Sequence, residues 1–146
     1  MQSTISKSQK LENKLRQNGY RVTKTKRDIF NILLNSNKPL SIKEISTQIK
    51  NSHFVSVYRS VDIMQKSEII KLVPQGFKNL FELSDAFKPH HHHTTCEKCG
   101  LTKEIRSENL EIILSQIALE SGFRPTSHHF ELFGICRSCD ESRKPL

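Results

Sequence analysis

Four cysteines in two Cys-x-x-Cys pairs constrain the fold of this chain more than any other feature of its sequence. They are Cys96 with Cys99 and Cys136 with Cys139. Two thiolates from each pair complete the closed tetrahedral shell that structural Zn²⁺ prefers. A redox-active pair would need a thioredoxin-like βαβ pattern around it, and buried free thiols rarely occur in two matched pairs. We therefore predict one structural zinc site, and we expect residues 90–146 to loosen without the ion.

The composition limits where such a chain works. Its 146 residues contain no run of about 18 apolar side chains, so we predict no membrane span. The first residues lack the apolar region of a secretory signal. We expect a cytoplasmic protein whose cysteines stay reduced.

Charge is divided unevenly along the chain. Residues 1–84 carry 15 Lys and Arg against 6 Asp and Glu, a net charge of +9, whereas residues 85–146 have a net charge of −1. All four cysteines and every histidine except His53 follow residue 85. This division predicts a domain of residues 1–84 that binds a polyanion and a domain of residues 90–146 that binds metal, joined by a hinge at about residues 85–89.

Apolar residues at helical spacing predict four helices in the N-terminal half. The first helix ends at Gly19, and the second starts after Thr25. Ser41 and Glu44 form a capping box at the start of the third helix. The fourth helix covers residues 54–66, and we expect its buried face to consist of Val57, Val61 and Met64. We expect its outward face to include Ser56, Arg59 and Ser60.

Two β-rich runs follow, residues 69–73 and 77–83, joined by the turn residues Pro74, Gln75 and Gly76. Helices followed by a hairpin are the order of a winged helix-turn-helix, in which the helix after the turn enters the DNA major groove. We predict that three side chains face that groove: Ser56, Tyr58 and Arg59. The side chains expected to neutralise phosphates are Lys24, Lys26, Arg27 and Arg59. A charged helix is more often only a solvated face, but the net charge of +9 favours nucleic acid.

Four consecutive histidines, His90 to His93, precede the first cysteine pair. In a strand, the odd-numbered histidines face one side and the even-numbered histidines face the other, so two separate metal sites can share the strand. Imidazole suits zinc, iron, nickel or copper, and carboxylates would complete the shells. Any single histidine can instead be an ordinary surface residue. Spacing alone does not pair the histidines with the available partners, which are Glu82, Glu104, Glu111, His128 and His129.

The remainder of the C-terminal half predicts a small α/β unit. We expect strands at residues 102–106 and 130–135, with a helix between them that starts at Ser107 and ends at Ser121 and Gly122. Its apolar stripe consists of Leu110, Ile113, Leu114 and Ile117. One helix over three short strands buries little, so we predict a homodimer in which a second copy covers the apolar surface. The predicted fold class is α+β, with a winged helix-turn-helix domain followed by a small α/β dimerisation domain that holds a four-cysteine zinc site.

Five motifs together resemble the ferric uptake regulator superfamily. They are Arg-Val-Thr-x-x-x-Arg from Arg21 to Arg27, Val57-Tyr58-Arg59, Phe81-Glu82-Leu83, the histidines with the first cysteine pair up to Gly100, and His-x-x-Glu-x-x-Gly-x-Cys-x-x-Cys from His128 to Cys139. Each motif is weak, but the combination is specific and extends over nearly the whole chain. The resemblance implies a homodimeric, metal-sensing transcriptional regulator, usually a repressor and not an enzyme, whose winged helix binds double-stranded operator DNA when metal is bound.

The resemblance also implies roles for individual residues. It assigns the four cysteines to structural Zn²⁺. It implies a sensing site formed by Glu82, His91, His93 and Glu104. It implies an additional metal site formed by His90, His92, Glu111 and His128. The DNA-binding residues that it implies are Arg21, Thr23, Lys26, Arg27, Ser56, Tyr58 and Arg59.

Departures from the family pattern bear on the sensed metal. Many members have a histidine just before the third helix, where this chain has Lys38 and Pro39, so the sensing site here can lack one ligand. His92 stands where many members have Asp and favours zinc, which would suit the zinc-uptake branch. Zinc sensors commonly use a cysteine in this site, however, and all four cysteines here are committed. The peroxide-sensing branch would favour Asp at the position that Glu82 occupies in this chain.

We therefore predict a metal-dependent, DNA-binding repressor of metal homeostasis that senses Zn²⁺ in preference to Fe²⁺, with iron sensing or peroxide sensing as the alternatives. Because Glu82 ends the wing while His91 and His93 belong to the other domain, a shared ion would hold the hinge at one angle.

Two other classes of protein fit the sequence less well. A zinc-ribbon interaction module explains the cysteines but not the basic helix. A metalloenzyme would need a catalytic spacing such as His-Glu-x-x-His, which the sequence lacks.

Overall fold

The computed structural model describes residues 6–75 and 77–141, and the chain divides into two compact units, Met1–Pro89 and His90–Leu146. Each unit has its own secondary structure. Within the described ranges, no helix combines the length and the apolar character that a membrane span requires.

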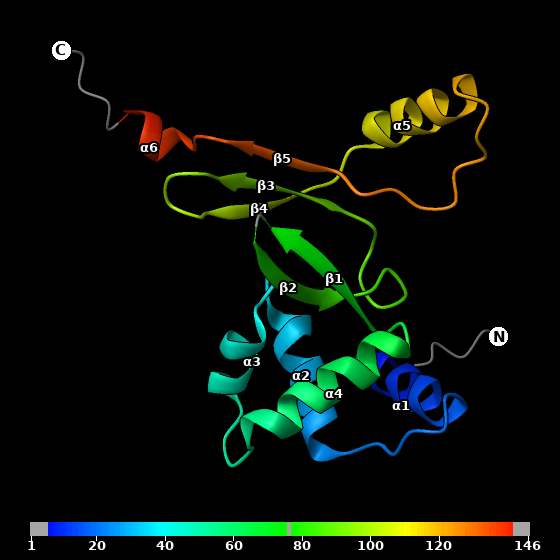
Figure 1. Ribbon diagram of the computed structural model, residues 1–146, viewed down its shortest axis with the longest axis vertical. Helices are drawn as coiled ribbons and strands as arrows, with labels where there is room; N and C mark the ends of the chain where they lie inside the picture. Colours follow the sequence, from blue (N-terminus) through cyan, green and yellow to red (C-terminus); the bar gives the residue numbers. More distant parts are fainter. Residues whose placement is uncertain (1–5, 76, 142–146) are drawn as a thin grey trace. The chain divides into compact units, whose positions relative to one another are not determined.

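Four helices and a hairpin form the first unit (Figure 1). The helices are α1 (Lys7–Gln17), α2 (Lys24–Asn35), α3 (Ile42–Gln48) and α4 (Phe54–Lys66). Strands β1 (Ile70–Gln75) and β2 (Lys78–Leu83) form the antiparallel hairpin, and Leu40, just before α3, makes an isolated bridge to Phe81 of β2. This order confirms the predicted winged helix-turn-helix.

Hydroxyl side chains start three of the four helices. Ser6, Thr23 and Ser41 each accept a hydrogen bond from the backbone N–H three residues further on. At α3 the carboxylate of Glu44 also accepts a hydrogen bond of 2.8 Å from the N–H of Ser41, which confirms the predicted capping box. Helix α2 begins earlier than predicted because its N-cap is Thr23 and not Thr25.

The core of the first unit lies between its helices and its hairpin. The largest fully buried side chains are Leu11, Leu15, Ile29, Phe30, Leu33, Ile45, Val57, Val61, Met64, Ile69, Ile70 and Leu83. The buried face of α4 is therefore the predicted one, but Ser60, which we expected on the outward face, is also buried. Ser60 lies three residues after Val57 and four before Met64, so helical spacing places it on the apolar face.

Strand β1 is longer than predicted. Pro74 and Gln75, which we assigned to the turn, pair with Asn79 and Lys78 in the register of the hairpin. Pro74 is tolerated there because each strand of a two-stranded sheet is an edge strand.

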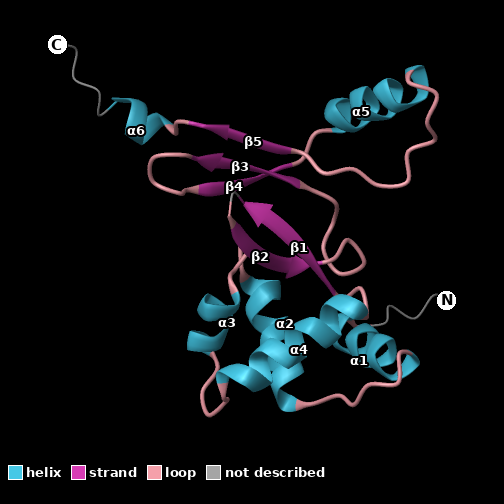
Figure 2. Ribbon diagram, viewed as in Figure 1, coloured by secondary structure: helices cyan, strands magenta, loops and turns pink. Residues whose placement is uncertain are grey.

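A three-stranded sheet and two helices form the second unit (Figure 2). The elements are β3 (His92–Cys96), β4 (Thr102–Ile105), α5 (Glu108–Glu120), β5 (Glu131–Gly134) and α6 (Arg137–Glu141). The central strand β3 runs antiparallel to β4 and parallel to β5. Helix α6 was not predicted, and His90 and His91 precede β3 instead of lying within it.

Little apolar surface is buried in the second unit. Among its described residues, only His91, His92, His93, Thr95 and Cys96 are buried. Helix α5 has no buried residue. Exposed apolar side chains lie on α5 and along β5, and we call this set the apolar surface of the second unit: Ile112, Ile113, Ile117, Leu119, Leu132 and Phe133.

Candidate metal centres and nucleic-acid interface

The parallel pairing of β3 with β5 brings the two cysteine pairs together. Cys96 ends β3 and Cys99 lies in the turn after it, while Cys136 immediately precedes α6 and Cys139 lies within it. The four sulfur atoms all lie within 4.8 Å of one another, and the Sγ atoms of Cys99 and Cys136 are 3.7 Å apart. Four sulfur atoms held about 2.3 Å from one tetrahedral ion would be about 3.8 Å apart, so this cluster fits Zn²⁺.

Hydrogen bonds within the cluster shift the pKa values of Cys96 and Cys139 in opposite directions. Hydrogen bonds from the backbone N–H groups of Cys136 and Cys99 lower the pKa of Cys96 to about 6, and the N–H of Cys136 lies 3.3 Å from the sulfur. Hydrogen bonding to the side chains of Cys136 and Cys99 raises the pKa of the Cys139 thiol to about 12. A divalent cation would replace the protons on all four, because metal binding selects the thiolates.

A second cluster of potential ligands joins β3 to α5. It consists of His90, His92, Glu111 and His128, whose ligand atoms all lie within 4.8 Å of one another. The carboxylate of Glu111 lies 2.7 Å from Nε2 of His92 and 3.1 Å from Nε2 of His128. The hydrogen bond with His92 and the nearby imidazoles hold the pKa of Glu111 below its usual range. Three imidazoles and one carboxylate suit Zn²⁺ or Fe²⁺.

The two odd-numbered histidines lie together. The ring centroids of His91 and His93 are 4.9 Å apart, and both side chains are buried. Nε2 of His91 lies 3.8 Å from Oε1 of Glu104, and the register of β3 with β4 pairs His93 with Glu104. The odd-numbered and even-numbered histidines therefore have different neighbours, as strand alternation predicts. His129 is exposed and belongs to no ligand cluster in the described part of the chain.

Glu82, the remaining residue of the predicted sensing site, belongs to the first unit and is buried on β2. Its Oε1 lies 3.2 Å from Nζ of Lys71, its partner across the hairpin, and the same Nζ lies 2.7 Å from Oδ1 of Asp85. Burial alone would lower the pKa of Lys71, but the two carboxylates raise it. The sequence analysis did not identify Lys71, because the hairpin register that places it opposite Glu82 was not predicted.

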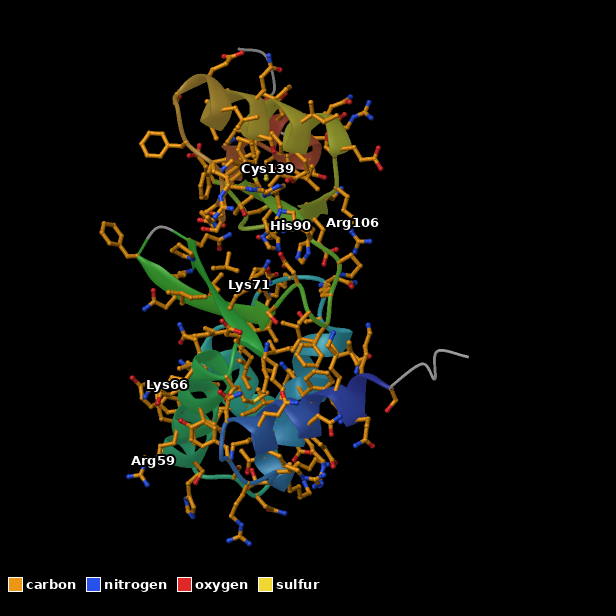
Figure 3. All side chains as sticks on the ribbon, turned by 90° about the vertical axis from the view of Figure 1, so that its right-hand side faces the viewer. Arg59, Lys66, Lys71, His90, Arg106 and Cys139 are labelled. Carbon is orange, nitrogen blue, oxygen red and sulfur yellow. The ribbon has the colours of Figure 1, made fainter. Side chains whose placement is uncertain are left out.

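Helix α4 presents a mixed aromatic and basic outer face. The exposed side chains of its first two turns, which we call the outer face of α4, are Phe54, Val55, Ser56, Tyr58 and Arg59. Figure 3 shows Arg59 pointing away from the body of its unit. The sequence analysis did not identify Phe54 and Val55 as part of this face. Their sequence position could have indicated it, because both are apolar and yet lie off the buried stripe of the helix.

The predicted DNA contacts around the start of α2 have other partners. The hydroxyl of Thr23 caps α2, and Arg27 forms an ion pair of 3.1 Å with Glu12. Lys26 is buried, its Nζ donates a hydrogen bond of 2.9 Å to the backbone oxygen of Arg21, and burial lowers its pKa. In the chain alone, a carbonyl therefore already holds the ammonium group of Lys26, and its contact with a DNA phosphate stays a prediction.

Known proteins resemble this chain along nearly its whole length. The model of the ferric uptake regulator family matches residues 17–133. The chain is 29% identical over 136 residues to the ferric uptake regulation protein of Campylobacter jejuni, covering 88% of this chain and 85% of that relative. It is 24% identical over 131 residues to the peroxide operon regulator of Bacillus subtilis, covering 87% and 89%. The structure of the Helicobacter pylori ferric uptake regulator, described as having three functional metal binding sites, has a TM-score of 0.82, 26% identity and 97% coverage of both chains.

Proposed function

The chain belongs to the ferric uptake regulator family, and from this membership we propose that it is a repressor that binds operator DNA when its regulatory metal ion is bound. Members of this family are transcription regulators and not enzymes. The observation that carries the proposal is that one chain combines the outer face of α4 with two complete sets of metal ligands beside β3. A repressor of this kind would act on DNA in the cytoplasm.

We propose three ion-binding sites. The four cysteines would hold structural Zn²⁺, and their sulfur spacing supports this assignment. The cluster around Glu111 would hold an additional ion. The regulatory ion would be held by His91, His93 and Glu104 together with Glu82 of the first unit. Three functional metal sites in the similar Helicobacter pylori regulator support this number.

We place Fe²⁺ before Zn²⁺ as the regulatory ion, which reverses the order that the sequence alone favoured. Its proposed donors are imidazole nitrogens and carboxylate oxygens, which suit both ions. Similar relatives from Campylobacter and Helicobacter are ferric uptake regulation proteins, which supports iron. Zinc stays the second candidate because imidazole donors suit Zn²⁺ as well as Fe²⁺.

The proposed regulatory donors come from both sides of the segment 85–89. Glu82 precedes that segment and His91 and His93 follow it, so one ion held by all three would restrict how the winged helix is presented to DNA. A preference of the ion for the DNA-binding arrangement worth about 1–3 kcal/mol would make a useful switch.

Alanine at both His91 and His93 tests the proposal. We expect this double variant to keep its structural zinc and its dimeric state but to lose metal-dependent binding of operator DNA in gel-shift titrations with Fe²⁺ and Zn²⁺ separately. His129→Ala, which changes a histidine outside the clusters, is the matched control. Metal-dependent DNA binding at the wild-type level in the double variant would refute the proposed regulatory site.

We also propose that the protein is a homodimer formed through the apolar surface of the second unit. That surface is exposed in a single chain, and Ile117 and Phe133 are among its members. Monomeric proteins rarely leave large contiguous apolar surface in water, and a twofold partner would cover it. A dimer would also present two winged helices to two half-sites of one operator.

A further inference from the structure

Lys71 of β1 joins two carboxylates of the first unit. Glu82, its partner across the hairpin, has a side chain that is only 5% exposed, and its Oε1 lies 3.2 Å from Nζ of Lys71. The same Nζ donates a hydrogen bond of 2.7 Å to Oδ1 of Asp85, whose side chain is 47% exposed. One ammonium group is therefore shared between a buried carboxylate and an exposed one.

The ammonium group of Lys71 compensates the buried charge of Glu82. A buried carboxylate that lacks a counter-charge destabilises the fold, and a paired cation offsets much of that cost. Glu82 needs such a cation whenever no metal ion is bound to it. Lys71 supplies one from the neighbouring strand, so it stabilises the hairpin in the absence of a regulatory ion.

A metal ion that bound Glu82 would meet this ammonium group. Lys71 lies on the carboxylate that the ion would need, and the two cations would repel each other. Water screens such repulsion only weakly at a buried carboxylate. Binding of the ion therefore requires the ammonium group to move away from Glu82.

Asp85 offers a place for the displaced ammonium group. It already accepts the shorter of the two contacts, and its exposure keeps an ammonium group there in contact with water. The four-carbon chain of lysine is flexible and can change partner without a movement of the backbone. Lys71 can therefore leave Glu82 and still keep a counter-charge.

We propose that Lys71 is a built-in competitor of the regulatory ion, whose ammonium group pairs with Glu82 in the ion-free protein and passes to Asp85 when the ion binds. This inference rests on the proposed function, because it needs Glu82 to be a ligand of that ion. The apparent affinity for the ion falls with the fraction of molecules in which Glu82 is available. Lys71 therefore raises the ion concentration at which the repressor responds. Since the competition depends on charge, it affects Fe²⁺ and Zn²⁺ alike.

Lys71→Met tests the inference in the full chain with its structural zinc retained. We expect this variant to bind the regulatory ion about tenfold more tightly than the wild type. Competition with a fluorescent chelator measures the affinity, with Zn²⁺ and with Fe²⁺ under anaerobic conditions as separate probes. Lys71→Arg keeps the cation and should bind the ion no more tightly than the wild type. Lys78→Met removes the same charge from an exposed position of the same hairpin, and should keep the wild-type affinity.

Asp85→Asn tests the second half of the inference. Without this carboxylate the ammonium group of Lys71 has Glu82 as its remaining partner of the two, so we expect several-fold weaker binding of the ion. In the Lys71→Met background the same substitution should have no effect, because the two residues act as a coupled pair. A loss of the same size in both backgrounds would show only the removal of a nearby negative charge and would overturn the transfer to Asp85.

A measurement without the regulatory ion is independent of metal affinity. Ion-free Lys71→Met should unfold at a lower temperature than the ion-free wild type, because Glu82 has lost its counter-charge, whereas Lys78→Met should not. An unchanged unfolding temperature would contradict the pairing of Lys71 with Glu82. If Lys71→Met does not fold at all, Asp85→Asn decides the matter, and wild-type metal affinity in that variant overturns the inference.

Failure of the inference can be told from failure of the proposed function. The regulatory ion is the one that the double variant with alanine at His91 and His93 loses. If this double variant binds as many ions as the wild type, the proposed regulatory site itself is wrong. If it loses one ion but Lys71→Met binds that ion no more tightly than the wild type, Lys71 is not a competitor and the proposed function stands. Equal tightening by Lys71→Met and Lys78→Met would indicate a general effect of charge and would also refute the inference.

Discussion

At the scale of single residues, the capping box of α3 links the charge of one carboxylate to fold stability. Burial raises the pKa of Glu44, but hydrogen bonds from the N–H and hydroxyl of Ser41 and from Lys38 outweigh it and hold that pKa below its usual range. A lowered pKa in the folded state stabilises the fold above the unfolded value of 4.5, and the contribution is lost as the pH falls through the folded-state pKa. We expect Glu44→Ala to lower the free energy of unfolding by about 1 kcal/mol at neutral pH and by less in acid.

Urea denaturation followed by circular dichroism at neutral pH and at acid pH measures this difference. Thr47→Ala, on the same helix and without an ionisable side chain, is the matched control and should have the same effect at both pH values. An equal loss for Glu44→Ala at both pH values would contradict the electrostatic explanation.

Single residues also show where sequence reasoning succeeds and fails. The capping box of Ser41 and Glu44 was predictable because all its hydrogen bonds are local. Ser60 was misassigned because we followed its polarity, whereas its helical position decides its burial. Lys26 was beyond prediction, because the carbonyl that its ammonium reaches depends on how the segment before α2 folds back.

At the scale of elements, α5 tests the proposed dimer. Ile117 lies on its exposed apolar side, and a glutamate there would have to bury an unpaired charge in each half of a twofold interface. We expect Ile117→Glu to raise the dimer dissociation constant by about 100-fold or more, as measured by sedimentation velocity across a concentration series. Gln116→Glu adds the same charge to the neighbouring position and should leave the dimer intact. Equal weakening by both variants would indicate a general charge effect and not an apolar interface.

Elements with a repeating pattern were predicted well, and contacts between elements were not. The bounds of α4, Phe54–Lys66, coincide with the predicted helix because its apolar residues recur at helical spacing. The hairpin was expected, but its register was not, because the turn signal Pro74-Gln75-Gly76 allows more than one pairing. The missed register hid the opposition of Lys71 to Glu82.

At the scale of the whole molecule, charge and ligand types separate along the sequence, so a basic unit and a metal-binding unit could be expected from counts alone. The grouping of the ligands could not be derived from counts or spacing, and only the family resemblance implied it. Glu111 and His128 are distant in sequence from His92, and only the placement of α5 and of the segment before β5 brings the three together. Strand alternation separated the histidines into two sets, but long-range packing decided which carboxylate joins each set.

The second unit should depend on its structural ion far more than the first. Among the described residues of this unit, Cys96 is the only buried hydrophobic residue. Few buried apolar contacts would therefore stabilise the second unit without the four-thiolate site. Structural Zn²⁺ supplies about 10–16 kcal/mol in small zinc-binding peptides, enough to decide whether such a unit folds. We expect a strong chelator to accelerate amide hydrogen exchange throughout β3, β5 and α6 while the helices of the first unit stay protected, measured by mass spectrometry on the full chain. Cys99→Ser should reproduce this pattern without chelator, whereas His129→Ala should not. Equal acceleration in both units, or protection of β3 and β5 after the metal has been removed, would show that the ion is not what holds the second unit together.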